Sequence, residues 1–238
     1  MIVQGASYPT YLINLKSRSD RLKHAISEAS KIAKAVLLIQ AIDGSLVTER
    51  DGGLLTNSQQ ACFDSHKLAF QEFLLTSYSY ALILEDDILI LDRDKIRSAL
   101  SSKEILNFDL IQFGYLKMGI RHRLDLVLTH IENWFFAFCS KVLNLLPINS
   151  KRYVSRLRFR RQIGNLPGFI QGDIRSGAHC YLISRKLAQF ILEINPPYYL
   201  PIDSLFGVLQ YTDKFKVSRS IRSLAGQSGS PSSIKGHQ

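Results

Sequence analysis

The chain has 238 residues, 46% of them hydrophobic and 21% charged, which is the balance of a globular protein with a sizeable core and excludes a disordered chain. Its formal net charge of +10 favours an anionic partner such as a nucleic acid, an anionic lipid or a phosphorylated substrate. Three cysteines, Cys62, Cys139 and Cys180, lie far apart without a Cys-x-x-Cys pair, which excludes a zinc ribbon and argues for a reducing compartment.

Neither the start of the chain nor its most apolar stretch predicts a signal peptide or a transmembrane segment. MIVQGASYPTYLINL has no basic region followed by a long apolar one, so we expect no signal peptide. WFFAFCSKVLNLLPI (134–148) contains Lys141 and Asn144 and is too short and too polar to cross a bilayer.

The pattern of apolar and turn residues predicts strands that alternate with helices. In chain order we expect a strand at 9–15, an amphipathic helix over 17–35, a strand at 36–40, a turn at 41–44, a helix from 56 to about 77, a strand at 80–85, a short helix at 92–100, strands at 109–114 and 179–184, a helix at 185–194 and a last strand at 214–218. Ser17 or Ser19 is the expected cap of the first helix, and Thr56 with Gln59 has the spacing of a capping box. This alternation is typical of an α/β domain with a mostly parallel central sheet.

Polar clusters follow three of the predicted strands at the point where each strand ends. They are Asn14 to Arg21, Asp43 with Gly44, and Glu85 to Asp87. Because ligands of open α/β sheets bind beyond the carboxyl ends of the strands, we expect these clusters to converge on one rim.

The third cluster places three carboxylates, Glu85, Asp86 and Asp87, between two apolar runs. Burying such charges without a positive partner costs several kcal/mol, so the triplet either sits at a solvent-facing strand end or holds a cation. Carboxylate oxygens suit a hard divalent cation such as Mn²⁺ or Mg²⁺, which commonly takes substrate phosphates as further ligands.

Six segments in order resemble glycosyltransferase family 25, which includes lipopolysaccharide and collagen galactosyltransferases. YLINLKSRSDRLKHA resembles the family's opening, hINLxxRxDR, and AIDG resembles its A-hDG element. SQQACFDSHKLAF is similar to its GC-hSH helix, ALILEDDI to its EDD strand, HCYLISRKLAQFIL to its GYhhSxxxA segment and LPIDSLF to its P-hD element. The resemblance covers about residues 9–115 and 175–235.

Three positions depart from the family's pattern. Ala61 and Cys180 stand where the family usually has glycine, and Asp64 stands where it has a small or apolar residue. Ala61 and Asp64 are expected beside the donor pocket, so they bear on which sugar is transferred.

The resemblance implies a GT-A-like nucleotide-sugar-binding fold with a helical, basic segment that faces the acceptor or a membrane, in a single glycosyltransferase domain over 1–238. Its parts would be a nucleotide-sugar-binding half (9–115), a helical basic insertion (116–174) and an acceptor and catalytic half with the C-terminal tail (175–238). The implied reaction is a metal-dependent, inverting transfer of a hexose to a lipooligosaccharide or related glycan. The expected donor is UDP-galactose, with Mn²⁺ or Mg²⁺ at the leaving diphosphate.

The resemblance also implies roles for single residues. The expected metal residues are Asp87, the first choice of ligand, and Glu85, which would face the ribose or a water held by the metal. Asp203 is the expected base that deprotonates the acceptor hydroxyl. The expected donor-binding residues are Asn14, Arg18, Arg21, Asp43, Gly44, His66, Glu85 and Asp86.

Each of these roles has a simpler structural alternative. The alternatives are a solvated strand end for Glu85, a turn for Asp43 and Asp86, a satisfied core position for His66 and a helix N-cap for Asp203. Arg18 and Arg21 could lie exposed in an ordinary first turn, although arginine is unfavourable at the positive end of a helix unless an anion is near.

Two functions of other classes remain open on the sequence. A non-catalytic nucleic-acid-binding module would use KRYVSRLRFRR (151–161), where Tyr153 and Phe159 interleave with basic residues, but no recognisable nucleic-acid motif accompanies it and we expect no nucleic-acid partner. A metal-dependent phosphohydrolase would use the same carboxylates, but the second acid cluster of a two-metal site is missing.

An apolar run (134–148) and a basic run (151–161) are adjacent and together predict a surface for an anionic membrane or the acceptor. Aromatic side chains suit the headgroup region, and lysine and arginine suit anionic lipid. The residues of this membrane or acceptor patch are Trp134, Phe135, Lys151, Arg152, Arg156, Arg158, Arg160 and Arg161. We therefore expect a cytoplasmic enzyme bound peripherally to the inner membrane.

The patch predicts salt-sensitive binding to vesicles of anionic lipid and none to neutral vesicles, because each basic residue near such a surface contributes about 1 kcal/mol. Replacing Arg156, Arg158, Arg160 and Arg161 with Gln should release the protein in a cosedimentation assay while sparing transfer to a soluble acceptor. If the wild-type protein ignores anionic vesicles at low salt, the patch serves the acceptor's own phosphates or another partner.

Overall fold

The computed structural model describes residues 8–47, 55–116, 166–212 and 214–228. These residues belong to one compact unit, which the chain enters twice, before and after residues 117–162. The membrane or acceptor patch, from Trp134 to Arg161, lies outside the described residues, as does Cys139. In the part of the chain that is described, no helix is both long enough and apolar enough to cross a membrane.

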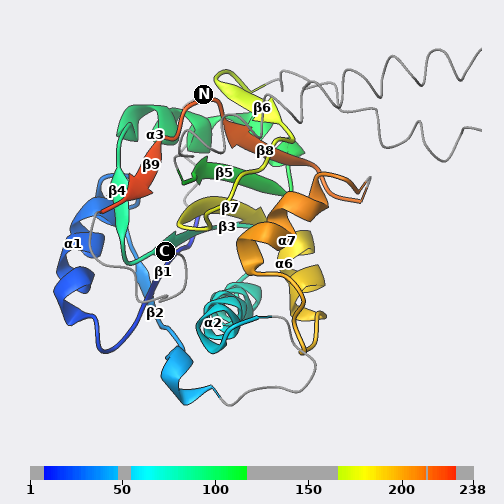
Figure 1. Ribbon diagram of the computed structural model, residues 1–238. Coiled ribbons are helices and arrows are strands. Elements are labelled where there is room, and N and C mark those ends of the chain that lie inside the picture. Colours follow the sequence, from blue (N-terminus) through cyan, green and yellow to red (C-terminus); the bar gives the residue numbers. More distant parts are fainter. Residues whose placement is uncertain (1–7, 48–54, 117–165, 213, 229–238) are drawn as a thin grey trace, which may run out of the picture. The chain divides into compact units, whose positions relative to one another are not determined.

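The described strands form one mixed sheet (Figure 1). They are β1 (Thr10–Asn14), β2 (Leu37–Gln40), β3 (Tyr80–Glu85), β4 (Ile88–Ile90), β5 (Leu110–Gly114), β6 (Phe169–Gln171), β7 (Cys180–Ser184), β8 (Val217–Ser220) and β9 (Ala225–Gln227). The main path runs β2-β1-β3-β7-β5-β8-β6, and β9 pairs with both β5 and β4. Strands β2, β1, β3, β5 and β8 share one direction, whereas β7 and β6 run against their neighbours.

Helices cover both faces of the sheet (Figure 1). They are α1 (Ser19–Ser30), α2 (Asn57–Leu74), α3 (Arg93–Ser101), α6 (Arg185–Leu192) and α7 (Ile202–Leu209), with 3₁₀ helices at Gly44–Leu46 and Lys103–Asn107. Side chains alternate along each strand, so Tyr11 and Ile83 join the core under α2, α6 and α7, while Leu12 and Leu82 join the core under α1 and α3. Two covered faces explain why the central strands are continuous apolar runs.

The predicted α/β class with a mainly parallel sheet is confirmed, and so is the capping box of α2. Thr56 Oγ1 accepts a hydrogen bond from the backbone N–H of Gln59 at 3.3 Å, and Gln59 Oε1 accepts one from the N–H of Thr56 at 3.0 Å.

The predicted serine cap of α1 is wrong, because the N-cap is Arg18 and no described side chain caps it. Asp20 instead lies in the first turn, where a negative charge favours the helix dipole, and it pairs with Arg18 at 3.1 Å.

Some elements were placed inaccurately or missed. The last predicted strand begins at Val217 and not at 214, and the short strands β4, β6 and β9 were not predicted. Each of these three strands has three residues, which is too short for a period-two pattern to separate it from a loop.

A close approach of two strands requires glycine at the end of β5. A Cβ added at Gly114 would lie 2.5 Å from Nε2 of His179 and 3.0 Å from the backbone oxygen of Ala225. His179 is fully buried in a close-packed interior, so its ring has no room to withdraw.

We expect Gly114→Ala to lower the free energy of unfolding by about 1–3 kcal/mol in a denaturant titration, because overpacking displaces the surrounding core. Gly207→Ala in α7 is the matched control, since a Cβ there meets no described atom within 4 Å and alanine favours a helix by up to about 1 kcal/mol. Equal effects of the two substitutions would contradict the close packing at Gly114.

Candidate active site

A cavity of about 380 Å³ lies at the carboxyl ends of β1, β2 and β3. It is walled by the segments that follow these strands, by the N-terminal half of α2 and by Gln227 of β9. The lining residues are Ile13, Leu15, Arg21, Ala41, Ile42, Asp43, Gly44, Ser45, Ser58, Ala61, Cys62, Ser65, His66, Glu85, Asp86, Asp87 and Gln227. The cavity therefore occupies the rim where open α/β sheets bind their ligands.

The structure brings most of the predicted site residues together at this cavity. Those that line it are Arg21, Asp43, Gly44, His66, Glu85, Asp86 and Asp87. Asn14, Arg18 and Asp203 are not among the lining residues.

Asp86 lines the cavity, and its carboxylate is held by two buried side chains. Its carboxylate accepts a hydrogen bond from Nδ2 of Asn14 at 2.8 Å and one from Nη1 of Arg21 at 3.2 Å, and all three residues are buried. The arginine supplies the positive partner that a buried carboxylate needs. Nδ2 of Asn14 also donates to the backbone oxygen of Arg18 at 3.2 Å, which ties the start of α1 to the same network.

Glu85, the last residue of β3, is held by His66 from α2. Nε2 of His66 lies 3.0 Å from Oε1 of Glu85, and Nδ1 lies 2.7 Å from the hydroxyl of Tyr181. The ionised carboxylate of Glu85 can only accept a hydrogen bond, so the proton on Nε2 of His66 faces it, and burial raises the pKa of Tyr181 well above its ordinary value, so the hydroxyl beside Nδ1 keeps its proton.

The same contacts keep Glu85 ionised. Burial by itself would raise the pKa of Glu85, but its hydrogen bond with His66 and its charge interactions with His66 and His179 outweigh burial and lower that pKa. Glu85 is therefore a carboxylate of fixed orientation and not a freely solvated strand end.

Among the carboxylates of the triplet, that of Asp87 is the least compensated by the described residues. Burial raises its pKa to about 7, the charges of Glu85 and Asp86 add to that increase, and Arg21 opposes it. Its Oδ1 is buried and accepts no hydrogen bond from any residue that the structure describes. A buried carboxylate oxygen beside two further carboxylates is the donor set that a hard divalent cation requires.

The loop after β2 is shaped by contacts with α2. Asp43 caps the 3₁₀ helix, with Oδ1 accepting from the backbone N–H of Ser45 at 2.9 Å and from its hydroxyl at 2.8 Å. Gly44 passes so close to α2 that a Cβ would lie 2.7 Å from Cα of Ser58. Ser65 of α2 accepts a hydrogen bond from the backbone N–H of Ile42 at 2.9 Å and so fixes the loop against the helix.

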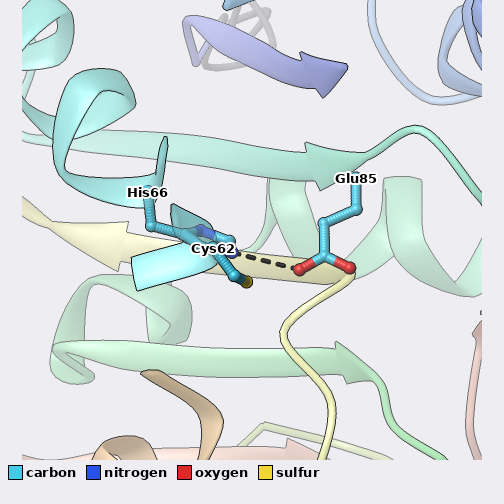
Figure 2. Close-up of side chains that lie close together, drawn as sticks. All are labelled: Cys62, His66 and Glu85. Carbon is cyan, nitrogen blue, oxygen red and sulfur yellow. Dashed lines mark hydrogen bonds and ion pairs between the residues drawn. The ribbon is translucent and has the colours of Figure 1, made fainter. Parts of the chain in front are cut away.

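Cys62 and His66 lie one helical turn apart on α2 and point toward Glu85 (Figure 2). Their ligand atoms and that of Glu85 all lie within 4.8 Å of one another. Burial raises the pKa of the Cys62 thiol well above its ordinary value, and the charges of Glu85, Asp203 and Asp87 raise it further. Cys62 thus forms part of the cavity wall as a protonated thiol.

Asp203 lies in the first turn of α7, whose N-cap is Pro201, so the N-cap alternative for Asp203 is wrong. Its Oδ2 accepts the backbone N–H of Gly177 at 3.0 Å, and its Oδ1 accepts that of Ser204 at 2.7 Å. Its effect on the thiol pKa shows that its charge reaches the Cys62 side of the cavity.

Asp64 does not lie beside the cavity, where the resemblance placed it. It accepts a hydrogen bond from the hydroxyl of Tyr198, whose ring stacks on Phe63 with 4.1 Å between centroids. Ala61, by contrast, does line the cavity, as predicted.

Several residues of the site were not singled out from the sequence. Ser58 and Cys62 lie on the cavity side of α2, and Gln227 arrives from β9. Helical spacing from His66 could have indicated Cys62, but no sequence signal connects Tyr181 or Gln227 with residues more than a hundred positions away.

Asp87→Asn should stabilise the metal-free protein at pH 8. A carboxyl group whose folded pKa of about 7 exceeds its ordinary 3.8 contributes stability at low pH, and that contribution is lost as the pH rises through 7. The variant removes this loss, so we expect its free energy of unfolding at pH 8 to exceed that of the wild type by on the order of 1–3 kcal/mol, with a gap that narrows toward pH 5.

Asp20→Asn is the control for this measurement in urea, because the hydrogen bond with Arg18 lowers the pKa of Asp20 and its neutralisation brings no stabilisation. A less stable Asp87→Asn protein at pH 8 without metal would show that Asp87 has a positive partner.

Comparison with known proteins shows to which family the chain belongs. No curated protein matches the chain. A family model described as glycosyltransferase family 25 (LPS biosynthesis protein) matches residues 7–206. The match spans most of the chain and includes β1, α2, the carboxylate triplet and the first part of α7. This chain belongs to glycosyltransferase family 25.

Proposed function

We propose that the chain is a metal-dependent, inverting glycosyltransferase that moves a hexose, galactose from UDP-galactose, onto a lipooligosaccharide or related glycan. The observation that carries the proposal is the cavity at the carboxyl ends of β1, β2 and β3, where an arginine and four carboxylates line a space of about 380 Å³. That volume is within the range of small-molecule sites. The GT-A-like arrangement proposed here places a nucleotide sugar at the same strand ends.

Asp87 and Glu85 are the residues that would hold Mn²⁺ or Mg²⁺. The buried Oδ1 of Asp87 and the fixed carboxylate of Glu85 fit a hard cation, because both offer oxygen ligands and the local charge is negative. When bound, such a cation supplies charge neutralisation at the leaving diphosphate. The protein's own part is to orient the two carboxylates, which His66 does for Glu85.

The remaining walls of the cavity support donor binding. Arg21 offers positive charge near the carboxylates, and the Asp43 loop, held by Ser65 and pressed against Ser58, offers backbone and side-chain groups for the nucleoside. Ala61 is buried in the cavity wall where the family usually has glycine, so its methyl group reduces the space for the sugar.

Asp203 is the proposed base that takes the proton of the acceptor hydroxyl as this oxygen attacks the anomeric carbon. Its carboxylate is half-buried and oriented by the backbone N–H groups of Gly177 and Ser204. Glu85 and Asp86 are occupied by His66, Asn14 and Arg21, and the charge of Asp203 acts on the Cys62 thiol in the cavity wall, which supports Asp203 as the base.

A lipid-linked acceptor would suit the basic run 151–161 and a peripheral position at the inner membrane. Aromatic and basic side chains together match a headgroup region that carries phosphate.

Donor binding can be tested by thermal shift. We expect UDP with Mn²⁺ to raise the melting temperature of the wild-type protein, because a ligand that binds only the folded state stabilises it by mass action, and we expect an oligonucleotide to leave it unchanged. Asp87→Asn should lose the increase that depends on metal. A shift with the oligonucleotide and none with UDP and Mn²⁺ would replace this proposal with nucleic-acid binding.

The base is tested by Asp203→Asn, which we expect to lower the rate of transfer by about 10²–10⁴-fold while the affinity for UDP changes by less than about twofold. Melting temperatures of the variant and the wild type are compared in parallel. If activity and melting temperature fall together, Asp203 acts only through its hydrogen bonds to Gly177 and Ser204.

A further inference from the structure

A side-chain cluster on the wall of the cavity has a ligand set different from that of the carboxylate triplet. It consists of the thiol of Cys62, the imidazole of His66 and the carboxylate of Glu85, whose ligand atoms all lie within 4.8 Å of one another (Figure 2). All three residues line the cavity, so a small solute reaches them from there. The cluster thus places one sulfur, one nitrogen and one oxygen ligand atom around a point that can be reached from the cavity.

The backbone geometry suits joint ligation. Cys62 and His66 stand at positions i and i+4 of α2, so both ligand atoms leave the same face of one rigid helix, and Glu85 approaches from the end of β3. Nε2 of His66 and Oε1 of Glu85 are already 3.0 Å apart, which is close to the separation of two ligands on one tetrahedral cation.

His66 also has the outer partner that metal-binding histidines usually have. Its Nδ1 lies 2.7 Å from the hydroxyl of Tyr181, a residue that is almost fully buried in β7. An oxygen on the second ring nitrogen fixes the orientation of the ring and directs Nε2 toward a cation. The carboxylates of Asp87 and Asp203 add negative charge around the same point.

We propose that Cys62, His66 and Glu85 form a binding site for Zn²⁺, separate in ligand chemistry from the oxygen site of Asp87. Zn²⁺ accepts sulfur, nitrogen and oxygen in a tetrahedral set, and a catalytic-type site of three protein ligands leaves the fourth position for water. Mn²⁺ and Mg²⁺ prefer oxygen, so the thiolate makes the site selective against them.

Binding requires a definite proton movement. The Cys62 thiol gives its proton to the solvent, and the ring proton of His66 moves from Nε2 to Nδ1, where it is donated to the hydroxyl oxygen of Tyr181. One proton is released for each Zn²⁺ bound, and the hydrogen bond between His66 and Glu85 is replaced by two bonds to the cation.

Glu85 belongs both to this cluster and to the proposed oxygen site. A Zn²⁺ ion on Cys62 and His66 therefore withdraws Glu85 from the cation beside Asp87, and it also occupies part of the cavity. It follows that Zn²⁺ inhibits donor-dependent transfer, a consequence that rests on the proposed function.

The test measures Zn²⁺ affinity of the full chain by competition with a chromophoric chelator. We expect Cys62→Ser to weaken the affinity by about 100-fold or more, and Tyr181→Phe to weaken it by about 10–100-fold through the lost partner of His66. Cys180→Ala is the matched control, because Cys180 packs in the core under α1 and α3 and does not line the cavity, and the affinity of this variant should stay within about twofold of the wild type. Co²⁺ in place of Zn²⁺ should give a thiolate-to-metal absorption band in the wild type and none in Cys62→Ser.

An unchanged affinity in a folded Cys62→Ser protein would overturn the site, as would loss of binding in a folded Cys180→Ala protein. In the second arm, transfer in Mn²⁺ is titrated with Zn²⁺ and each variant is compared with its own rate without zinc. Inhibition of the wild type but not of Cys62→Ser supports the shared role of Glu85, and equal inhibition of both contradicts it. If no variant transfers sugar under any condition, the proposed function fails while the binding measurements still decide the site.

Discussion

Three consecutive carboxylates at the end of β3 concentrate negative charge in a place that is only partly open to water, and the site is arranged around neutralising it. Asp86 is paired with Arg21 and Asn14, and Glu85 is held by His66. Asp87 has no comparable partner among the described residues, and its pKa rises to about 7 as a result of burial and of its two acidic neighbours. An anionic diphosphate would be repelled by this charge unless a cation stood between them. The excess negative charge therefore supports the proposed cation site.

The neutralising groups come from two helices that begin at the rim of the sheet. The register of β1 and β3 pairs Ile13 with Glu85, which places Asn14 beside Asp86. Arg21, in the first two turns of α1, then reaches the same carboxylate. Helix α2 supplies His66 to Glu85 and, one residue earlier, Ser65 to the loop after β2. Two short motifs far apart in the chain thus converge because the sheet brings their strands together.

Much of the fold could be predicted, because its central strands are long apolar runs and α2 has a complete capping box. The prediction was less accurate where local signals were weak. Strands of three residues carry no periodicity, and the start of α1 depends on Asp20 and Arg18 and not on a serine cap. The antiparallel direction of β7 could not be predicted either, since a run of apolar residues does not distinguish a parallel from an antiparallel strand.

The sequence by itself determined the family, the α/β class and the rim residues, because strand ends and helix starts are local patterns and the six motifs are short. Only the tertiary structure decided which partner each of those residues binds. Asp86 lies in a buried ion pair while Asp87 next to it has none with any described residue, although the two have the same side chain and adjacent positions. Asp64 accepts a hydrogen bond from Tyr198, and Cys62 lies close to Glu85. These differences depend on which side chains from distant segments meet each atom. The spacing of residues along the chain does not show which charges will lie close together in the folded protein.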